Sequence, residues 1–404
     1  MINLETPRKF TALIAQAHQV AAEVLRPISR KYDLAEHTYP KELDMLASLI
    51  DGMNAGSDTA GTGATGVRRT EDSSAEKRNR NGTNLSTVLS IVEMCWGDVG
   101  LLLSMPRQGL GNSAIASVAS EEQLTRFEGR WAAMAITEPE AGSDSAAIKT
   151  TAVLDGEDYV LNGEKIYVTS GERAELIVVW ATLDRSKGRA AIKSFVVERS
   201  NPGLILERLE HKLGIRASDT AAFRLENCRV GREDMLGSPD IDAKQGFGGA
   251  MQTFDNTRPL VAAMAVGLAR ACLDETRPVL EGAGVVLDHD RPALTQHAAA
   301  ARLIALEADY EAARLLTMQA AWMADNGKPN SLQASIAKAK AGRGCVEIAL
   351  GCVELCGSVG YGEGELLEKW ARDAKILDIF EGTQQIQLLI IARLLLGKTS
   401  AELR

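Results

Sequence analysis

Apolar residues along this chain follow three successive patterns. From residue 1 to about 133 they recur at the spacing that is typical of amphipathic helices. From 134 to 244 they alternate with polar residues or form short β-branched runs, which favours strands. From 245 to 404 the helical spacing returns with few breakers, so an antiparallel helical bundle is expected. The chain is therefore predicted to fold as a helical domain, a β-domain and a second helical domain, in that order.

One segment interrupts the first helical zone. Residues 51–84 (DGMNAGSDTAGTGATGVRRTEDSSAEKRNRNGTN) are rich in Gly, Ser, Thr, Asp and Arg and contain almost no large apolar side chain. Such a segment cannot bury enough apolar surface to offset the entropy that ordering costs. A mobile loop is predicted there.

The β-zone contains a series of strand signals. YVLNGEKIYV (159–168) alternates around Asn162–Gly163, a dipeptide that is typical of a two-residue hairpin turn. Three other runs are rich in β-branched or aromatic residues and lie between turn-forming segments: LIVVWATL (176–183), AIKSFVVE (191–198) and AAFRLENCRV (221–230). A compact β-domain is expected from them.

Helical periodicity in the last zone predicts long segments at about 246–280, 293–325, 331–356, 365–379 and 384–396. Gly327 and Pro329 mark one turn between them, and the run from Gly360 to Gly364 marks another.

Composition excludes several classes of protein. With 404 residues, 45% of them hydrophobic and 25% charged, the chain is long enough for two or three globular domains. A net charge of −9 offers no basic surface for nucleic acid or for anionic membranes. We find no run of 18 apolar residues and no signal-peptide core, so no membrane insertion and a cytoplasmic location are expected.

Six cysteines form no CxxC pair, and the five histidines are scattered along the chain. Neither pattern is typical of a zinc site or of a catalytic triad. Buried free thiols and no metal site are therefore expected.

One carboxylate stands out in the stretch KILDIFEGTQQIQLL (375–389). Glu381 lies between an apolar cluster that ends at Phe380 and an apolar helix for which Thr383 is a suitable N-cap. Two interpretations are open at this point. The acid could interact with the positive end of the helix dipole, or it could be a general base whose pKa is raised by apolar neighbours.

Two stretches of the β-zone combine hydroxyl groups with bare backbone or an aromatic ring. In ITEPEAGSDSAAIKT, Thr137 and Ser143 share a loop with Gly142. Such a loop can bind a planar heterocycle or phosphate oxygens, or it can be a simple connection. In IYVTSG, Tyr167 and Thr169 alternate along a strand and share one face. They could bind a flat cofactor, or they could pack as a cross-strand pair.

A further stretch, FDNTRP (254–259), holds Asp255 and Arg258 at i,i+3 spacing, which by itself indicates an intrahelical ion pair. It belongs, however, to an ordered series with ITEPEAGSD, LNGEKIYVTSG, KLGIRASDT and RDAKILDIFEGTQQIQ. In these motifs and in its three zones the chain resembles the acyl-CoA dehydrogenase family of flavoenzymes. The resemblance is close from about residue 110 onward and loose over the first hundred residues.

The resemblance implies an acyl-CoA dehydrogenase-like fold with an N-terminal α-helical domain (1–133), a middle β-domain (134–244) and a C-terminal four-helix bundle (245–404). FAD would lie between the last two domains, and by position its contacts would be Thr137, Ser143, Tyr167, Thr169, Thr383 and Gln385. Asp255 and Arg258 match residues beside the acyl-CoA substrate.

The resemblance also implies a reaction. Glu381 takes the position of the base that removes the α-proton while flavin N5 accepts the β-hydride, which yields the trans-2-enoyl-CoA. With these motifs present, we interpret Glu381 as the base. An electron-transfer flavoprotein is the implied electron acceptor, and acyl-chain length and type stay open.

Two departures concern the part of the FAD site that a neighbouring subunit supplies in family homo-oligomers. EGAGVVLD (281–288) stands where the family has Arg-x-x-Phe-Gly, and Glu354 stands where it has a glutamine. We therefore expect an oligomer and hypothesise a hetero-oligomer with a homologous subunit. Two alternatives are an acyl-CoA oxidase, against which the chain length argues, and an FAD-poor or non-catalytic structural subunit, against which Glu381 and Arg258 argue.

Overall fold

The structure, a computed structural model, describes residues 6–54, 81–107, 110–241, 248–399 and 402. Before the sheet the chain is helical. Its described α-helices there are α1 (Thr11–Val20), α2 (Arg26–Leu34), α3 (Glu42–Asn54), α4 (Thr83–Gly97), α5 (Val99–Leu103), α6 (Leu110–Val118) and α7 (Glu121–Phe127). Helix α3 continues to Asn54 and α4 begins at Thr83, so the predicted loop 51–84 is helical at both ends. The rest of that predicted loop, 55–80, lies outside the described residues.

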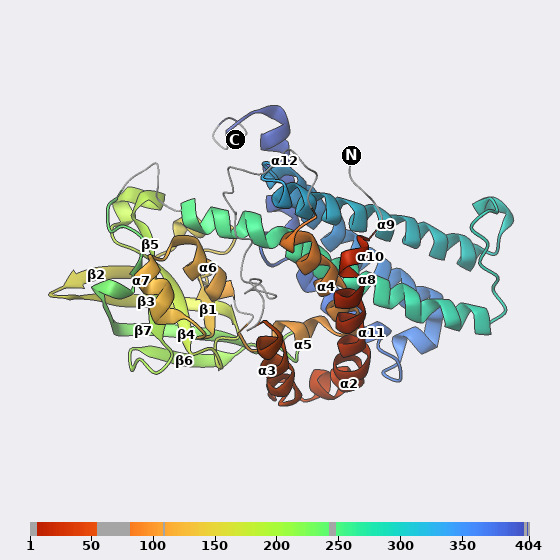
Figure 1. The fold of residues 1–404 in the computed structure, drawn as a ribbon, viewed down its shortest axis with the longest axis horizontal. Helices are drawn as coiled ribbons and strands as arrows, with labels where there is room; N and C mark the ends of the chain where they lie inside the picture. Colours follow the sequence, from red (N-terminus) through yellow and green to blue (C-terminus); the bar gives the residue numbers. More distant parts are fainter. Residues whose placement is uncertain (1–5, 55–80, 108–109, 242–247, 400–401, 403–404) are drawn as a thin grey trace.

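The β-domain is one mixed sheet with strand order β6-β7-β3-β2-β4-β5-β8, and β1 pairs in parallel with β4. Its strands are β1 (Ala132–Ala135), β2 (Thr151–Asp155), β3 (Asp158–Thr169), β4 (Leu176–Thr182), β5 (Ile192–Glu198), β6 (Leu204–Leu209), β7 (Thr220–Gly231) and β8 (Met235–Leu236). Figure 1 shows this sheet at one end of the molecule and the long helices at the other.

Strand β4 explains why LIVVWATL reads as a continuous apolar run. Alternate side chains of a strand point to opposite faces of the sheet, and here both faces are covered. Ile177 and Val179 join the apolar cluster that contains Phe195 and Phe223. Val178 and Trp180 join a second cluster, which contains Ile115 of α6 and Phe127 of α7. A strand that is buried on both faces does not alternate with polar residues.

The predicted hairpin turn at Asn162–Gly163 is wrong. Both residues lie inside β3, and the turn lies earlier, where Asp155 of β2 pairs with Asp158 of β3 around Gly156. Gly156 has a left-handed φ of 64°, which glycine adopts without strain. Gly163 instead marks a register shift against β7, where a Cβ atom would lie 2.4 Å from Thr150 Oγ1. The Asn-Gly dipeptide therefore serves close packing at a bulge rather than chain reversal.

The C-terminal zone forms the predicted helical bundle. Its α-helices are α8 (Gly248–Gly282), α9 (Ala298–Asp325), α10 (Ser331–Tyr361), α11 (Leu367–Leu377) and α12 (Gln384–Leu396). Helix α10 packs against the other four. By length and apolar composition α10 would pass for a membrane-spanning segment among the described helices. Its contacts on several sides identify it as a central helix of the bundle. The six cysteines are buried and free, as predicted.

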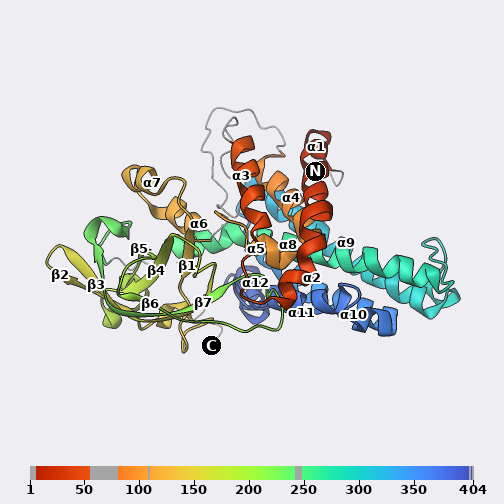
Figure 2. The same ribbon diagram turned by 90° about the horizontal axis from the view of Figure 1, so that it is seen from below.

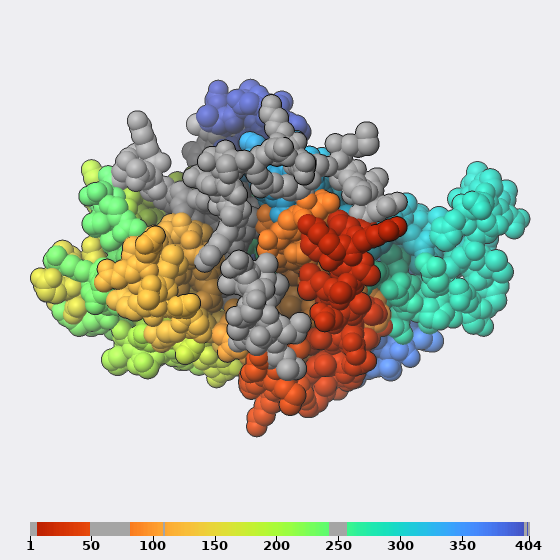
Figure 3. All heavy atoms as spheres, in the orientation of Figure 1, coloured from red at the N-terminus to blue at the C-terminus, as the bar shows by residue number. Residues whose placement is uncertain are grey.

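The N-terminal helices and the bundle share one apolar core. Helix α4 packs on α8 and α9, and side chains of all three helices belong to the same cluster. The crossing of α4 and α8 is close, because a Cβ atom at Gly267 would lie 2.3 Å from the carbonyl oxygen of Val92. Figure 2 shows the N-terminal helices beside the bundle, and Figure 3 shows them on the surface between the β-domain and the far tip of α8 and α9.

A buried charge cluster joins all three zones. Lys369 of α11 lies 2.5 Å from Asp98 and 2.6 Å from Asp373, and all three side chains are buried. Burial alone would lower the pKa of Lys369, but the two carboxylates outweigh it and raise that pKa. Asp373 Oδ1 also accepts the backbone N–H of Ile215, between β6 and β7, at 2.5 Å. The cluster therefore fixes the β-domain against the two helical zones.

Candidate functional site

Glu381 lies on a strained bend between α11 and α12. Its φ is 57° and that of Gly382 is 90°, so two successive residues have left-handed backbone. This conformation costs a non-glycine residue about 1–3 kcal/mol and persists only where the surroundings impose it. Gln387, a buried residue of α12, imposes it by donating from Nε2 to the carbonyl oxygens of Glu381 and Gly382. Thr383 is the predicted N-cap of α12, and its Oγ1 accepts the N–H of Ile386 at 3.3 Å.

The bend carries the Glu381 carboxylate to α8. Thr257 Oγ1 donates to Glu381 Oε2 at 2.8 Å, and the Thr257 side chain is buried. Burial raises the pKa of Glu381, while Thr257, Lys338 and Arg258 lower it to a smaller extent. A carboxylate whose proton affinity is increased by its surroundings is suited to act as a general base.

Lys338 of α10 brings a positive charge to this site. Its side chain is fully buried, and Nζ donates to the carbonyl oxygen of Gly382 at 2.6 Å. Burial lowers the pKa of Lys338 to about 8, although the carboxylates of Glu381 and Asp378 favour the protonated form. The ammonium therefore holds the backbone of the bend, and its positive charge also lowers the pKa of the Glu381 carboxyl.

Arg258 comes next to Thr257 on α8 and is 3% exposed. Its positive charge lowers the pKa of both Glu381 and Lys338, so it belongs to the same electrostatic group. Asp255 lies on the same helix, and its side chain lies outside the described residues. The predicted ion pair between Asp255 and Arg258 therefore stays a prediction.

A second group of predicted residues lies at the end of β3. Val168 is buried, while Tyr167 before it is 61% exposed and Thr169 after it is half-buried. The strand is irregular there: its pairing with β7 shifts between Lys165 and Val168, and Tyr167 has a φ of 57°. The bulge leaves the aromatic ring on the surface instead of in the cross-strand pair that was the alternative.

Thr137 joins this second group through the backbone, because its carbonyl oxygen accepts the N–H of Ile166 at 2.9 Å. The next residue, Glu138, is buried and lies 2.7 Å from the ammonium of Lys165, which is buried too. Glu138 also accepts the backbone N–H of Thr150 at 2.9 Å. Burial lowers the pKa of Lys165 to about 8, against the effect of Glu138. This ion pair braces the loop after β1 against β3.

The two remaining predicted residues, Ser143 and Gln385, are exposed. Ser143 follows Gly142, at which a Cβ atom would meet nothing within 4 Å. The predicted residues with described contacts or chain neighbours in common thus fall into two groups, and no contact assigns Ser143 to either of them. One surrounds Glu381 at the start of α12, and the other lies at the β1 and β3 end of the sheet.

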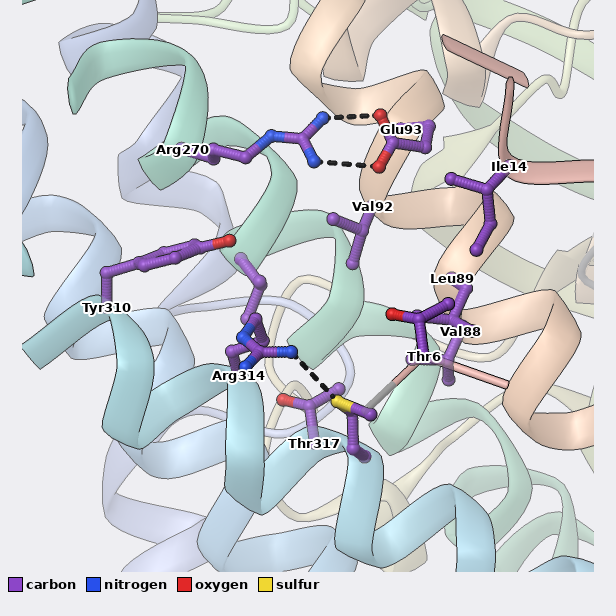
Figure 4. Close-up of a pocket in the computed structure, with 12 residues that line it drawn as sticks. Thr6, Ile14, Val88, Leu89, Val92, Glu93, Arg270, Tyr310, Arg314 and Thr317 are labelled. Carbon is purple, nitrogen blue, oxygen red and sulfur yellow. Dashed lines mark hydrogen bonds and ion pairs between the residues drawn. The ribbon is translucent and has the colours of Figure 1, made fainter. Parts of the chain in front are cut away.

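The described residues also enclose a cavity of about 230 Å³ between α1, α4, α8 and α9. Figure 4 shows Arg270 facing Glu93 across its upper wall, with the two guanidinium nitrogens 2.7 and 2.6 Å from the carboxylate oxygens. None of the predicted site residues lines this cavity. Of its charged side chains, Glu93 pairs with Arg270, and Arg314 pairs with Glu311 outside the lining.

Sequence reasoning missed Thr257, Lys338 and Gln387. Lys338 had a usable signal, because it occupies a helical position between Ala334 and Ala341, which are buried. A lysine on the apolar face of a helix is rarely buried without a partner. The other two residues gave no comparable signal, since a threonine and a glutamine are ordinary on a helix.

Comparisons with known proteins agree with this geometry. The family descriptions "Acyl-CoA dehydrogenase, middle domain" and "Acyl-CoA dehydrogenase, C-terminal domain" match residues 133–228 and 244–396. The chain is 31% identical over 392 residues to the mitochondrial short-chain specific acyl-CoA dehydrogenase of Bos taurus, covering 96% of this chain and 90% of that protein. The chain belongs to the acyl-CoA dehydrogenase family, as its motifs predicted. It is an oxidoreductase of a family whose enzymes are FAD-dependent.

Solved structures agree with the fold. The butyryl-CoA dehydrogenase of Megasphaera elsdenii has a TM-score of 0.82 and 29% identity, covering 98% of this chain and 100% of that one. A chain solved in work on the electron transferring flavoprotein of Acidaminococcus fermentans has a TM-score of 0.82 and 30% identity, with the same coverage. The predicted acyl-CoA dehydrogenase-like fold is therefore confirmed.

Proposed function

We propose that this chain catalyses the FAD-dependent α,β-dehydrogenation of an acyl-CoA thioester, with Glu381 as the base that removes the α-proton. The main observation in support is the position of the Glu381 carboxylate. The strained bend places it against Thr257 and within reach of the positive charges of Lys338 and Arg258. Strained residues of this kind cluster at active sites, which supports a functional role for Glu381.

The described residues fit the cofactor. Tyr167 presents an exposed ring two residues before the half-buried Thr169, and such a ring suits a planar heterocycle. At the start of α12 the Gln384 amide oxygen is inaccessible to solvent and accepts no hydrogen bond from the described residues. Helix N-termini also favour phosphate groups. We propose that Thr137, Ser143, Tyr167, Thr169, Thr383 and Gln385 contact FAD, which when bound would supply the acceptor for the β-hydride.

The chain's own residues then prepare the proton transfer. Thr257 occupies Oε2 of Glu381, which leaves Oε1 to accept the α-proton. Burial raises the pKa of Glu381 and makes its carboxylate a stronger base, while the charges of Lys338 and Arg258 oppose that rise. The backbone N–H of Glu381 is the donor that we propose for the thioester oxygen, where negative charge develops. Asp255 and Arg258 are the proposed residues beside the acyl-CoA.

Glu381→Gln tests this role, because the amide preserves the shape of the side chain and removes the proton acceptor. We expect flavin reduction by acyl-CoA under anaerobic conditions to slow by several orders of magnitude, which is a barrier increase above about 4 kcal/mol. Stopped-flow bleaching of the flavin, with substrates from butyryl- to palmitoyl-CoA, measures it and also ranks acyl-chain length. Glu363→Gln, an exposed acid outside the site, is the matched control. Near wild-type bleaching in Glu381→Gln would reject the assignment.

The identity of the electron acceptor distinguishes a dehydrogenase from an acyl-CoA oxidase and from a non-catalytic subunit. We propose an electron-transfer flavoprotein, which is supported by the likeness to the chain from the Acidaminococcus fermentans work. An acyl-CoA oxidase would instead consume O₂ at the rate of flavin reduction. A non-catalytic subunit would bind little FAD and show no bleaching. Measuring O₂ consumption beside flavoprotein reduction distinguishes the three.

We also propose that a homologous second subunit completes the FAD site. Residues 281–288 contain no arginine, and Glu354 is exposed on α10, three residues before Gly357, where the helix is kinked with a φ of 55°. A homodimer would lack one charge-assisted contact to the cofactor, which is worth about 1.5–3 kcal/mol, or roughly ten- to a hundredfold in affinity.

Expressing this chain alone and with candidate homologous subunits tests the second proposal. FAD per chain is then measured from absorbance after gel filtration. We expect weak FAD binding alone and about one FAD per pair of chains in the complex. Full occupancy and full activity of the chain alone would contradict the hetero-oligomer.

A further inference from the structure

Three side chains with metal-ligating atoms meet away from the Glu381 site. Glu36 and His37 lie between α2 and α3, and His211 follows β6. One ligand atom from each lies within 4.8 Å of the other two. His211 Nδ1 is 2.8 Å from Glu36 Oε2, and the two imidazole centroids are 4.8 Å apart. The cluster connects the N-terminal helical zone to the β-domain.

His37 is the member that needs an explanation. Its φ of 68° is left-handed, an uncommon conformation for a residue other than glycine, although histidine adopts it more often than most. Both ring nitrogens are inaccessible to solvent and have no hydrogen-bond partner among the described residues. Ring nitrogens that are shielded from water and have no partner cost free energy unless something binds them.

The other two members are placed to share an ion with it. The backbone N–H of Lys212 donates to Glu36 Oε1 at 3.0 Å, which fixes the carboxylate and leaves Oε2 facing His211. The His211 side chain is 82% exposed, so solvent can supply further ligands. The Lys212 ammonium is the cation that opposes metal binding here, and it is held 2.8 Å from the carbonyl oxygen of Ser218.

We propose that Glu36, His37 and His211 bind a divalent transition-metal ion, for which Zn²⁺ is the best match. Two imidazoles and one carboxylate are a common ligand set for Zn²⁺, with bonds of about 2.0–2.2 Å. Such bonds place neighbouring ligand atoms about 3.3–3.5 Å apart. His211 Nδ1 and Glu36 Oε2, now 2.8 Å apart, must therefore separate slightly, and atoms at the 4.8 Å limit must approach each other by more than about 1 Å. Rotation of the exposed His211 supplies this movement. The bound ion would link the α2–α3 connection to the β6–β7 connection.

This proposal replaces the expectation from the sequence that no metal site exists. That expectation rested on scattered histidines, and Glu36 and His211 are in fact 175 positions apart in the chain. Folding, not local spacing, brings them together, so no motif in the sequence could show the cluster.

The test uses full-length protein without a polyhistidine tag, stripped with a chelator and titrated with ZnCl₂ by calorimetry. We expect one Zn²⁺ per chain. His37→Asn and His211→Ala should each weaken binding at least about tenfold. Asparagine is chosen because it tolerates the left-handed backbone at position 37. His289→Ala is the control, since His289 pairs with Glu307 at 2.6 Å without a second histidine.

Thermal unfolding gives an independent readout. Zn²⁺ should raise the Tm of the wild type and of His289→Ala, because a ligand that binds the native state stabilises it. It should raise the Tm of His37→Asn and His211→Ala by a smaller amount at the same Zn²⁺ concentration. The proposal is overturned if the wild type binds no stoichiometric Zn²⁺, or if His37→Asn and His211→Ala bind it as tightly as His289→Ala.

Discussion

The ammonium of Lys338 donates to the carbonyl oxygen of Gly382 at 2.6 Å, one residue after the proposed base Glu381. The same lysine lowers the pKa of the Glu381 carboxyl through its charge. One buried side chain thus sets both the geometry of the bend and the basicity of its carboxylate. This double role can be tested, because geometry and charge have different experimental signatures.

Lys338→Met should shift the pH dependence of flavin reduction. The charge of Lys338 favours ionised Glu381, so its removal raises the pKa of Glu381 and moves the rising limb of the pH profile to higher pH. Rapid-mixing rates across pH 5 to 9 measure this shift. A profile with an unchanged midpoint and only a lower plateau would show that Lys338 acts through the backbone alone.

Thr257→Val should also raise the pKa of Glu381, because it removes the hydrogen bond from Oγ1 to Oε2 at 2.8 Å. The matched control is Thr276→Val on the same helix. Thr276 is fully buried too, but its hydroxyl donates to the carbonyl oxygen of Cys272. We expect both variants to lose about 0.5–1.5 kcal/mol of stability. A midpoint shift in the Thr276 variant as well would contradict a specific role for Thr257.

Arg258 is expected to support the site by charge and by planar shape. Arg258→Ala should impair turnover, while Arg258→Lys keeps the charge and loses the fork of donors. We therefore expect Lys to restore the pH midpoint but not the full kcat/KM. Steady-state kinetics of the two variants with one acyl-CoA, across pH, measure the midpoint and kcat/KM. Equal activity of the lysine variant and the wild type would reject the geometric role.

Glu138→Gln should destabilise the protein by about 3–5 kcal/mol, because it leaves the buried ammonium of Lys165 without its partner. The penalty should decrease between pH 7 and pH 9. The pKa of Lys165 is about 8 even beside Glu138, and loss of the carboxylate lowers it further, so the lysine sheds its charge as pH rises. Urea unfolding at both pH values measures this. In the double variant Glu138→Gln, Lys165→Met, most of the lost stability should return.

The features that depend on local sequence patterns were predicted correctly. Periodicity located the three zones, and the helices α9, α10 and α12 begin within a few residues of their predicted starts. The start of the helix after Glu381 followed from Thr383, its predicted N-cap. Local rules failed where tertiary contacts determine the backbone conformation. At Asn162–Gly163 the dipeptide favours a turn, but strand pairing with β7 keeps it inside β3.

The surroundings of Glu381 were harder to predict for the same reason. Thr257 and Lys338 reach it from α8 and α10, which are far from it in the sequence. Their hydroxyl and ammonium groups become informative only when packing brings the three segments together. The family resemblance pointed to Glu381 as the base, which stays a prediction, but it could not show which side chains determine its pKa.

The core shared by α4 and α8 has a consequence for biosynthesis. The two helices are tied by the ion pair of Glu93 and Arg270, which are 177 positions apart. A ribosome adds about 5–20 residues per second, so α4 waits on the order of ten seconds for its partner while the whole β-domain emerges between them. We expect nascent chains that end before α8 to protect the β-domain from protease but not α4. The molecule would then be completed from its middle outward, and its amino-terminal helices would be among the last parts to become stable.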